Sequence, residues 1–383
     1  MEITYIDNNQ ALHDACQQFK SCHALCVDTE FHRESTYYPE LALVQLSDGE
    51  LTVCVDPFTI DDFQPMLDLF TDPAIVKVLH ASQQDMEIFF HRFNVLPAPV
   101  FDTQIAAGLL GYGEQVGYAP MIKQVLDVDI DKSQTRTDWM QRPLNKKQIE
   151  YAASDVFYLA QAYRLIHQQL DELGRLDWLQ DDFDALSRAE QYQPDTRAMW
   201  KKVKGHQQLR SNQLAILQSL AAWREIAAQQ RDKPRRRVAP DEALIDISKQ
   251  KPNSVDKIYQ LRALQKFRLA ADDAKALLNA LQQGQQQPKE NWPSLPKKYR
   301  LSMEQDALVD AMQALIKLMA AEHRINPGLY ASRKQLEALL FDDTDNPLLQ
   351  GWRRAHGGQQ VLDFLANRVS LRVESGQLIA EHA

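Results

Sequence analysis

Apolar residues in the first ~170 positions form short runs that alternate with amphipathic segments. The strand-like runs are rich in Val and Leu and bounded by turn residues, and they are 24–31, 41–49, 51–57 and 74–82. Helical spacing of apolar residues is found in 59–70, 83–93, 101–110 and 145–170. We expect Asp102 and Asn145 to cap the last two helices. This alternation predicts an α/β domain with a sheet flanked by helices.

From about residue 190 the pattern changes to helical stretches without convincing strands. The segment GQQQPKENWPSLPKK, 284–298, has the Gln and Pro bias of a linker. The blocks on either side of it have similar length, and each opens with a long helical pattern, which indicates a weak duplication of one helical module. The expected domains are an α/β domain at 1–190, a linker at 191–208, and helical domains at 209–288 and 289–383.

Charge divides along the same boundary. Residues 1–200 contain 14 Lys+Arg and 32 Asp+Glu, a net charge of −18, and the remainder has a net charge of +9. This division suggests an acidic part that binds cations and a basic part that binds a polyanion. Two solvated surfaces of opposite charge would look the same.

Four carboxylates are candidates for one site. Asp28 and Glu30 end a strand-like run and, two positions apart, point to the same face. Asp85 lies in the first turn of a predicted helix, and Asp155 follows Tyr151 by four residues on another, so that those two share a face.

Each candidate taken singly has an ordinary explanation. The first pair could be an exposed strand end, and Asp85 a helix N-terminal charge favoured by the dipole. Asp155 could be an exposed polar position and Tyr151 a half-buried aromatic. Taken together, the four carboxylates match the oxygen ligands that Mg²⁺ or Mn²⁺ prefers, and two such ions about 4 Å apart catalyse phosphodiester cleavage.

The stretches VDTEF, LHASQQDMEIF and YAASDVFYL resemble, in order and spacing, the three motifs of the DEDD exonuclease superfamily in its Tyr-bearing branch. The flanking TYYPELALVQLSDG, FDTQIAA and DKSQTRTDWMQRPL resemble bacterial ribonuclease D. The helical block from about 210 resembles the helicase-and-ribonuclease-D C-terminal (HRDC) module, and the last block a divergent second copy. The resemblance covers essentially the whole chain.

This resemblance implies a ribonuclease H-like mixed sheet and a metal-dependent 3′→5′ exoribonuclease that releases nucleoside 5′-monophosphates. It makes Asp28, Glu30, Asp85 and Asp155 the ligands of two divalent cations and Tyr151 the residue that orients the attacking water. The implied substrates are structured RNAs, chiefly the 3′ trailers of tRNA precursors. Phe31 is expected either to stack on the terminal base or to lie in the core.

Basic residues concentrate in 200–237, and the sequence RDKPRRRVAP is expected to be a loop because Pro234 and Pro240 oppose helix. Arg235, Arg236 and Arg237 are predicted to contact RNA phosphates without reading sequence. A solvated charged face is the ordinary alternative.

Two other functions stay open: a DNA 3′→5′ exonuclease, whose catalytic motifs would look the same, and a non-catalytic RNA-binding protein. The cysteines Cys16, Cys22, Cys26 and Cys54 lack zinc or disulfide spacing, which favours free thiols in the cytoplasm. No apolar stretch is long enough to cross a bilayer, and we expect no membrane association. The family resemblance suggests a monomer with no obligate protein partner.

Overall fold

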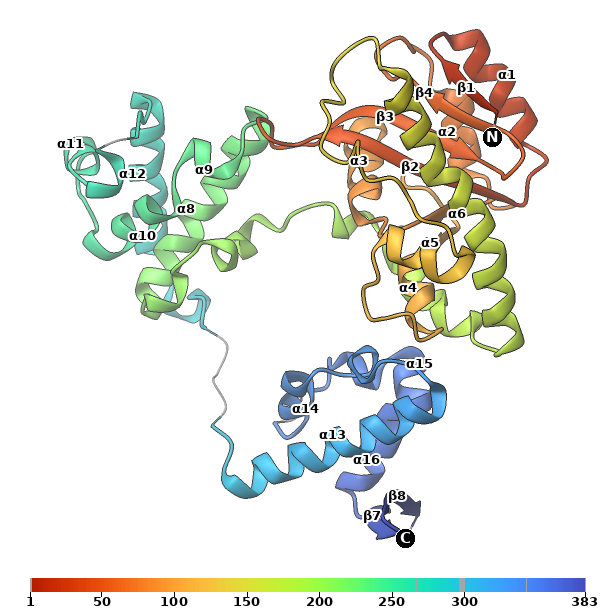
Figure 1. The fold of residues 1–383 in the computed structure, drawn as a ribbon. Coiled ribbons are helices and arrows are strands. Elements are labelled where there is room, and N and C mark those ends of the chain that lie inside the picture. Colours follow the sequence, from red (N-terminus) through yellow and green to blue (C-terminus); the bar gives the residue numbers. More distant parts are fainter. Residues whose placement is uncertain (1, 266, 296–299, 342, 383) are drawn as a thin grey trace. The chain divides into compact units, whose positions relative to one another are not determined.

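The computed structural model describes residues 2–265, 267–295, 300–341 and 343–382. The chain divides into two compact units (Figure 1). Unit 1 contains Met1–Glu30, Leu41–Arg188 and Tyr299–Ala383, and unit 2 contains Phe31–Glu40 and Ala189–Lys298.

Unit 1 is built on a six-stranded mixed sheet in the order β1-β4-β3-β2-β5-β6. Its strands are β1 (Ile3–Ile6), β2 (Ala24–His32), β3 (Glu40–Ser47), β4 (Thr52–Val55), β5 (Val76–Leu79) and β6 (Val100–Asp102). β2 pairs with β5 in parallel, and the last pair in register is Cys26 with Val78. Because β2 continues past this pair, Asp28 and Glu30 lie beyond the paired part of β5, at the edge of the sheet where parallel strands end.

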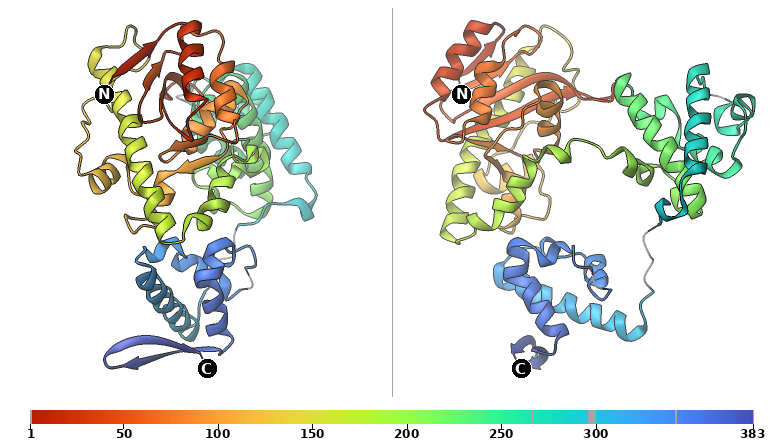
Figure 2. Two further views of the ribbon diagram at one scale, coloured as in Figure 1. Left: turned by 90° about the vertical axis from the view of Figure 1, so that its right-hand side faces the viewer. Right: turned by 180° about the vertical axis from the view of Figure 1, so that it is seen from behind.

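Helices cover both faces of this sheet. α1 (Asn9–Phe19), α2 (Gln64–Thr71) and α3 (Gln83–Phe93) form one layer, in which the rings of Phe70 and Phe89 are 4.9 Å apart. The other face carries α4 (Thr103–Gly108), α5 (Tyr118–Leu126) and α6 (Lys146–Glu172), as the views in Figure 2 show. α6 crosses β1, β4 and β5 and begins with a capping box formed by Asn145 and Gln148, while Asp102 caps α4. The predicted α/β fold and both helix caps are confirmed.

The last part of the chain packs into unit 1 through a shared hydrophobic core. Its elements are α13 (Met303–His323), α14 (Arg333–Leu339), α15 (Gly351–Arg353), α16 (Gln359–Leu365), β7 (Val369–Glu374) and β8 (Gln377–His382). Arg175 donates hydrogen bonds to the carbonyls of Leu109 and His323, and Trp178 stacks on Trp352 beside α7 (Gln180–Leu186). Among the described residues, no helix is long and apolar enough to span a membrane.

The β7–β8 hairpin lies where the sequence pattern indicated helices alone. Its two-residue turn is Ser375-Gly376, and both residues have positive φ, at 51° and 80°. Such a turn matches the twist of paired strands. The alternation in VSLRVE on one side of it was therefore a signal for a strand that the helical interpretation passed over.

In its described residues, unit 2 consists of helices joined by short irregular segments, together with the tip of the β2–β3 connection. Its helices are α8 (Ser211–Gln230), α9 (Arg235–Val238), α10 (Asp241–Gln250), α11 (Val255–Tyr259) and α12 (Ala271–Gln286). α8 and α12 approach so closely that a Cβ on Gly284 would lie 2.5 Å from Cα of Ile216, so the crossing requires glycine. The short α9 replaces the loop expected in RDKPRRRVAP, since Pro234 precedes the helix as its N-cap rather than interrupting it.

Residues 31–40, which we call the β2–β3 tip, are fixed to α8 by polar contacts. The Tyr37 hydroxyl donates to Glu225 at 2.5 Å, and Glu225 is only 1% exposed and also pairs with Arg235. Asp232 accepts hydrogen bonds from the backbone N–H groups of Tyr37 and Tyr38, both at 2.9 Å. The strand that carries Asp28 and Glu30 thus continues directly into a segment held by the helical unit.

We predict that Asp232→Gly selectively loosens this tip. Asp232 has a left-handed φ of 46°, which glycine adopts without strain, so the substitution removes only the carboxylate. The backbone amides of Tyr37 and Tyr38 would each lose one hydrogen bond. Their hydrogen exchange should therefore become about 5- to 10-fold faster. Asp127→Gly is the control, because Asp127 is also left-handed but pairs with Lys123. Unchanged exchange in Asp232→Gly would show that these contacts do not hold the tip.

Candidate active site

Three of the predicted carboxylates converge. One oxygen from each of Asp28, Glu30 and Asp155 can be chosen such that all three lie within 4.8 Å of one another. Asp28 and Glu30 come from one face of β2, and Asp155 comes from α6, which crosses the sheet. The strand period of two and the helix crossing therefore bring together residues 125 or more positions apart in the chain.

Asp85 lies on α3 beside this group but not within it. It is 7% exposed, and its Oδ1 accepts a hydrogen bond from the hydroxyl of Thr29, the residue between the two β2 carboxylates. The turn before α3 is fixed by Asp102, whose carboxylate accepts hydrogen bonds from the N–H groups of Ala81 and Ser82. Asp85 is thus held at the start of its helix by β2 and β6 together.

Burial raises the pKa of every carboxyl in the group, and neighbouring carboxylates raise the pKa of Asp28, Glu30 and Asp85 further. Burial is the main cause, and it raises the pKa of Asp155 to about 7 and, with the charges of Asp28, Asp155 and Asp85, that of Glu30 to about 10. Burial and the charge of Asp155 also raise the pKa of Asp28, as burial and the charge of Asp28 do for Asp85. The site favours either protons or a cation at neutral pH.

A cleft of about 390 Å³ opens beside these carboxylates. Asp28, Asp155 and Tyr151 line it, together with Lys132 and Thr135 from the α5–α6 loop. The remaining lining residues are His80, Gly117, Tyr118, Ala119, Pro120, Ile130 and Leu159. The cleft is thus acidic at one end and has an apolar wall, which suits a phosphate linkage next to a sugar or base.

Tyr151 lies one helical turn before Asp155, as its spacing predicts. Its hydroxyl is 3.5 Å from the hydroxyl of Thr135, and its ring centroid is 6.1 Å from that of Trp139. Burial, followed by the charge of Asp155, raises the pKa of Tyr151 to about 12. The phenol therefore keeps its proton at neutral pH and can donate a hydrogen bond in the cleft.

The predicted RNA contacts have different surroundings. Phe31 is half-buried on β2 and is not among the residues that line the cleft in the described part of the chain. Arg235 is half-buried in its ion pair with Glu225, with the guanidinium 4.8 Å from the Tyr37 ring. Arg236 and Arg237 are exposed, and Arg236 lies 3.4 Å from Glu242. RNA binding by these four residues stays a prediction.

Sequence reasoning missed several contacts that shape the site. Thr29 and Asp102 position Asp85, and the Tyr118 hydroxyl donates to the backbone carbonyl of Asp155. Lys132 and Thr135 lie in DKSQTRTDWMQRPL, which the family resemblance identified without a role for either. A position 16 residues before Tyr151 has no periodic relation to it, so no pattern predicted that contact.

Known proteins resemble this chain in both sequence and fold. A family model described as 3′-5′ exonuclease matches residues 3–171, and one for the HRDC domain matches 213–281. Ribonuclease D of Bartonella henselae is 36% identical over 355 residues, which is 92% of this chain and 87% of that protein. The chain belongs to the ribonuclease D family. Ribonuclease D of Pseudomonas paraeruginosa is 35% identical over 95% of this chain and 98% of that protein.

The solved structures agree with this assignment. The crystal structure of Escherichia coli RNase D, described as an exoribonuclease involved in structured RNA processing, matches with a TM-score of 0.83 and 32% identity, covering 96% of this chain and 99% of that one. A protein from Bifidobacterium adolescentis, 23% identical, shares the fold with a TM-score of 0.70 over 94% of this chain and 95% of that one. This ribonuclease D family member is thus a 3′→5′ exoribonuclease that acts on RNA, in a family that uses divalent metals, and the DNA exonuclease alternative is not favoured.

We predict that the metal-free protein loses stability as pH rises. A carboxyl whose folded pKa is raised stabilises the fold below its unfolded pKa, and this contribution is lost as pH rises through the folded value. The pH range over which this stability is lost runs from 3.8 to about 7 for Asp155 and from 4.5 to about 10 for Glu30. Without metal, Asp28→Asn should therefore raise the unfolding temperature at pH 8 by at least about 2 °C and flatten its pH dependence.

Thermal unfolding in chelator, followed by circular dichroism, checks this. The exposed Asp61 serves as the matched control, and Asp61→Asn should leave the pH profile unchanged. Added Mg²⁺ should stabilise the unsubstituted protein more than Asp28→Asn, because a cation relieves the same repulsion. A lower unfolding temperature for Asp28→Asn in chelator would contradict the predicted destabilisation by repulsion among the carboxylates.

Proposed function

We propose that Asp28, Glu30, Asp85 and Asp155 hold two divalent cations, Mg²⁺ or Mn²⁺, and that the enzyme trims RNA 3′ ends to nucleoside 5′-monophosphates. One observation carries this proposal: carboxylates from β2 and α6 converge within 4.8 Å beside a cleft. A polyanionic substrate would be repelled from this acidic end unless cations neutralised it.

The donor set fits such cations. It consists of carboxylate oxygens alone, the hard ligands that Mg²⁺ and Mn²⁺ prefer over softer metals. Burial raises the pKa of Asp155 and Glu30, and neighbouring carboxylates raise that of Glu30 further, so a bound cation would relieve the repulsion in the cluster. Cations bound there would activate a water molecule and stabilise the departing 3′ oxygen.

The protein's own groups then orient the reactants. Tyr151 keeps its proton and donates a hydrogen bond that orients the attacking water, while Thr29 and Asp102 keep Asp85 in place. The apolar wall of the cleft, formed partly by Tyr118 and Leu159, receives the terminal nucleoside. Hydrolysis at the last linkage leaves the phosphate on the released nucleotide.

We further propose that the preferred substrates are structured RNAs, chiefly tRNA precursors with 3′ trailers. The E. coli relative, which is described as involved in structured RNA processing, supports this. So do the basic residues concentrated in 200–237, because a basic module can hold a folded RNA body while its single-stranded end is trimmed. The carboxylate cluster is complete within one chain, which fits a monomer. Free, mostly buried cysteines fit the reducing cytoplasm.

The decisive experiment uses a tRNA with a short 3′ extension, labelled at its 5′ end, in Mg²⁺ or Mn²⁺. We expect a ladder that shortens from the 3′ end, and Asp155→Asn should slow it at least about 1,000-fold because a ligand is lost. Asp171→Asn, at an exposed position on the same helix, should cut at the normal rate. Equal activity in both variants would exclude the proposed ligand set.

The exposed pair Arg236 and Arg237 provides a separate test of RNA binding. Replacing both with Gln should weaken binding of the tRNA. The slope of the logarithm of the affinity against the logarithm of the salt concentration should become shallower by about 2, one for each phosphate contact. The kcat on a short oligoribonucleotide should stay unchanged, because that substrate does not need the helical unit. An unaltered salt slope would show that these arginines are only a solvated face.

A further inference from the structure

The α5–α6 loop, residues 127–145, is the longest segment of unit 1 without helix or strand among the described residues. Loops of this length inside a compact domain usually have a function. This one lines the cleft with Lys132 and Thr135 and then leads directly into α6, which carries Tyr151 and Asp155. Contacts with the rest of unit 1 must hold this loop in place.

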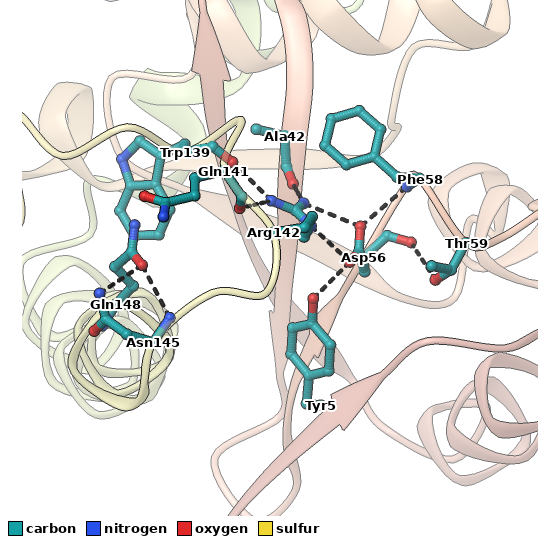
Figure 3. Close-up of polar contacts among 10 residues, drawn as sticks. All are labelled: Tyr5, Ala42, Asp56, Phe58, Thr59, Trp139, Gln141, Arg142, Asn145 and Gln148. Atoms are coloured by element: carbon teal, nitrogen blue, oxygen red, sulfur yellow. Dashed lines mark hydrogen bonds and ion pairs between the residues drawn. The ribbon is translucent and has the colours of Figure 1, made fainter.

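Arg142 is the anchor of this loop (Figure 3). Its Nε and Nη2 donate to the two carboxylate oxygens of Asp56 at 2.7 and 3.0 Å. Nη2 also donates to the carbonyl of Ala42 in β3 at 2.5 Å, and Nη1 donates to the carbonyls of Trp139 and Gln141 at 2.8 and 2.9 Å. All five N–H groups of the guanidinium therefore have acceptors, divided between the sheet and the loop itself.

The sheet side of this anchor is buried and held by further hydrogen bonds. Asp56, 2% exposed, follows β4 directly and accepts a further hydrogen bond from the Tyr5 hydroxyl of β1 at 2.6 Å. Burial alone would raise the pKa of Asp56, but the hydrogen bonds from Arg142 and Tyr5 outweigh burial and lower it, so the carboxylate stays charged. The Phe58 ring, 4.5 Å from the guanidinium carbon, covers Arg142.

The other side of the anchored loop reaches Tyr151. Trp139, whose carbonyl Arg142 holds, is 5% exposed and presents its ring to that of Tyr151. Gln148 of α6 donates to Thr137 and to the Asp138 carbonyl at 3.1 and 3.2 Å, which joins the loop to the first turns of the helix. Thr135 contacts the Tyr151 hydroxyl itself.

We propose that the Arg142–Asp56 pair is a positioning device for Tyr151. By fixing the α5–α6 loop against β3 and β4, it sets the place of Thr135 and Trp139 and hence of the Tyr151 hydroxyl over the cleft. The inference rests on the proposed role of Tyr151 in orienting water. It assigns a task to DKSQTRTDWMQRPL, which the catalytic carboxylates leave unexplained.

Lysine cannot reproduce this anchor, because it lacks the planar fork that reaches Asp56 and three carbonyls together. Arg142→Lys should therefore lower kcat on a short oligoribonucleotide about 10-fold through misplacement of Tyr151, with KM changed less than about 3-fold. The Mg²⁺ concentration for half-maximal activity should stay constant, because the loop holds none of the proposed ligands. A general loss of structure would move all three quantities.

The test is a double-mutant cycle between Arg142→Lys and Tyr151→Phe. If Arg142 acts through Tyr151, the lysine substitution should cost less than about 2-fold in kcat once the hydroxyl is gone. An undiminished 10-fold loss in the Tyr151→Phe background would overturn the inference while leaving the proposed function intact. Normal kcat for Tyr151→Phe alone would instead remove the proposed role of Tyr151, and the inference with it.

Two further variants keep the test decisive if Arg142→Lys does not fold. Asp56→Asn keeps the shape of the anchor and removes its charge. Thr135→Val, at an exposed position, removes the hydroxyl that lies 3.5 Å from the Tyr151 hydroxyl. Both variants should lower kcat as Arg142→Lys does. Neither should lower kcat further when it is combined with Tyr151→Phe. Arg353→Lys is the matched control. Arg353 forms an ion pair with Asp182, and its side chain is about as exposed as that of Arg142, so this variant should have normal kcat. Additive losses in both cycles would overturn the proposal.

Discussion

The repulsion among closely spaced, partly buried carboxylates is the constraint on which this structure depends. Negative charges held within a few ångströms in a partly dry site raise one another's pKa and oppose folding unless a cation or protons offset them. A chain that keeps Asp28, Glu30 and Asp155 together must supply a rigid frame, because a flexible one would relax by moving the charges apart. The same strain that costs stability in the absence of metal makes the site receptive to divalent ions.

The frame is assembled from elements distant in sequence, and each proposed ligand has its own support. β2 supplies two carboxylates through strand alternation, the hydroxyl of Thr29 and the turn held by Asp102 fix Asp85, and α6 delivers Asp155 after a capped start. Tyr151 differs, because its polar end contacts the loop before α6 rather than the sheet. The contacts that support the carboxylates and those that support the Tyr151 hydroxyl are therefore different, and a substitution that disturbs one set need not disturb the other.

The sequence predicted what depends on periodicity and caps. The α/β alternation, the caps at Asp102 and Asn145, and the shared faces of Asp28 with Glu30 and of Tyr151 with Asp155 all follow from local rules. It did not predict the Arg142 anchor, the separation of Asp85 from the tightest group or the ion pair of Arg235, since these are contacts between residues with no periodic relation. The β7–β8 hairpin was missed for a different reason: its Ser-Gly turn signal was present, but the helical context outweighed it.

The charge division of the chain follows from the same repulsion. An acidic catalytic part would slow its own encounter with RNA, because long-range repulsion acts before any cation at the site is within contact distance. On the proposed function, a basic helical unit on the same chain would counter this by binding the RNA body, which would raise the effective concentration of the 3′ end near the cleft. Affinity for a folded RNA should then depend on salt and on the helical unit, whereas the rate of cleavage depends on the carboxylates and Tyr151. On this proposal, the helical unit 2 would bind the RNA body, and the carboxylates on the sheet of unit 1 would cleave its 3′ end.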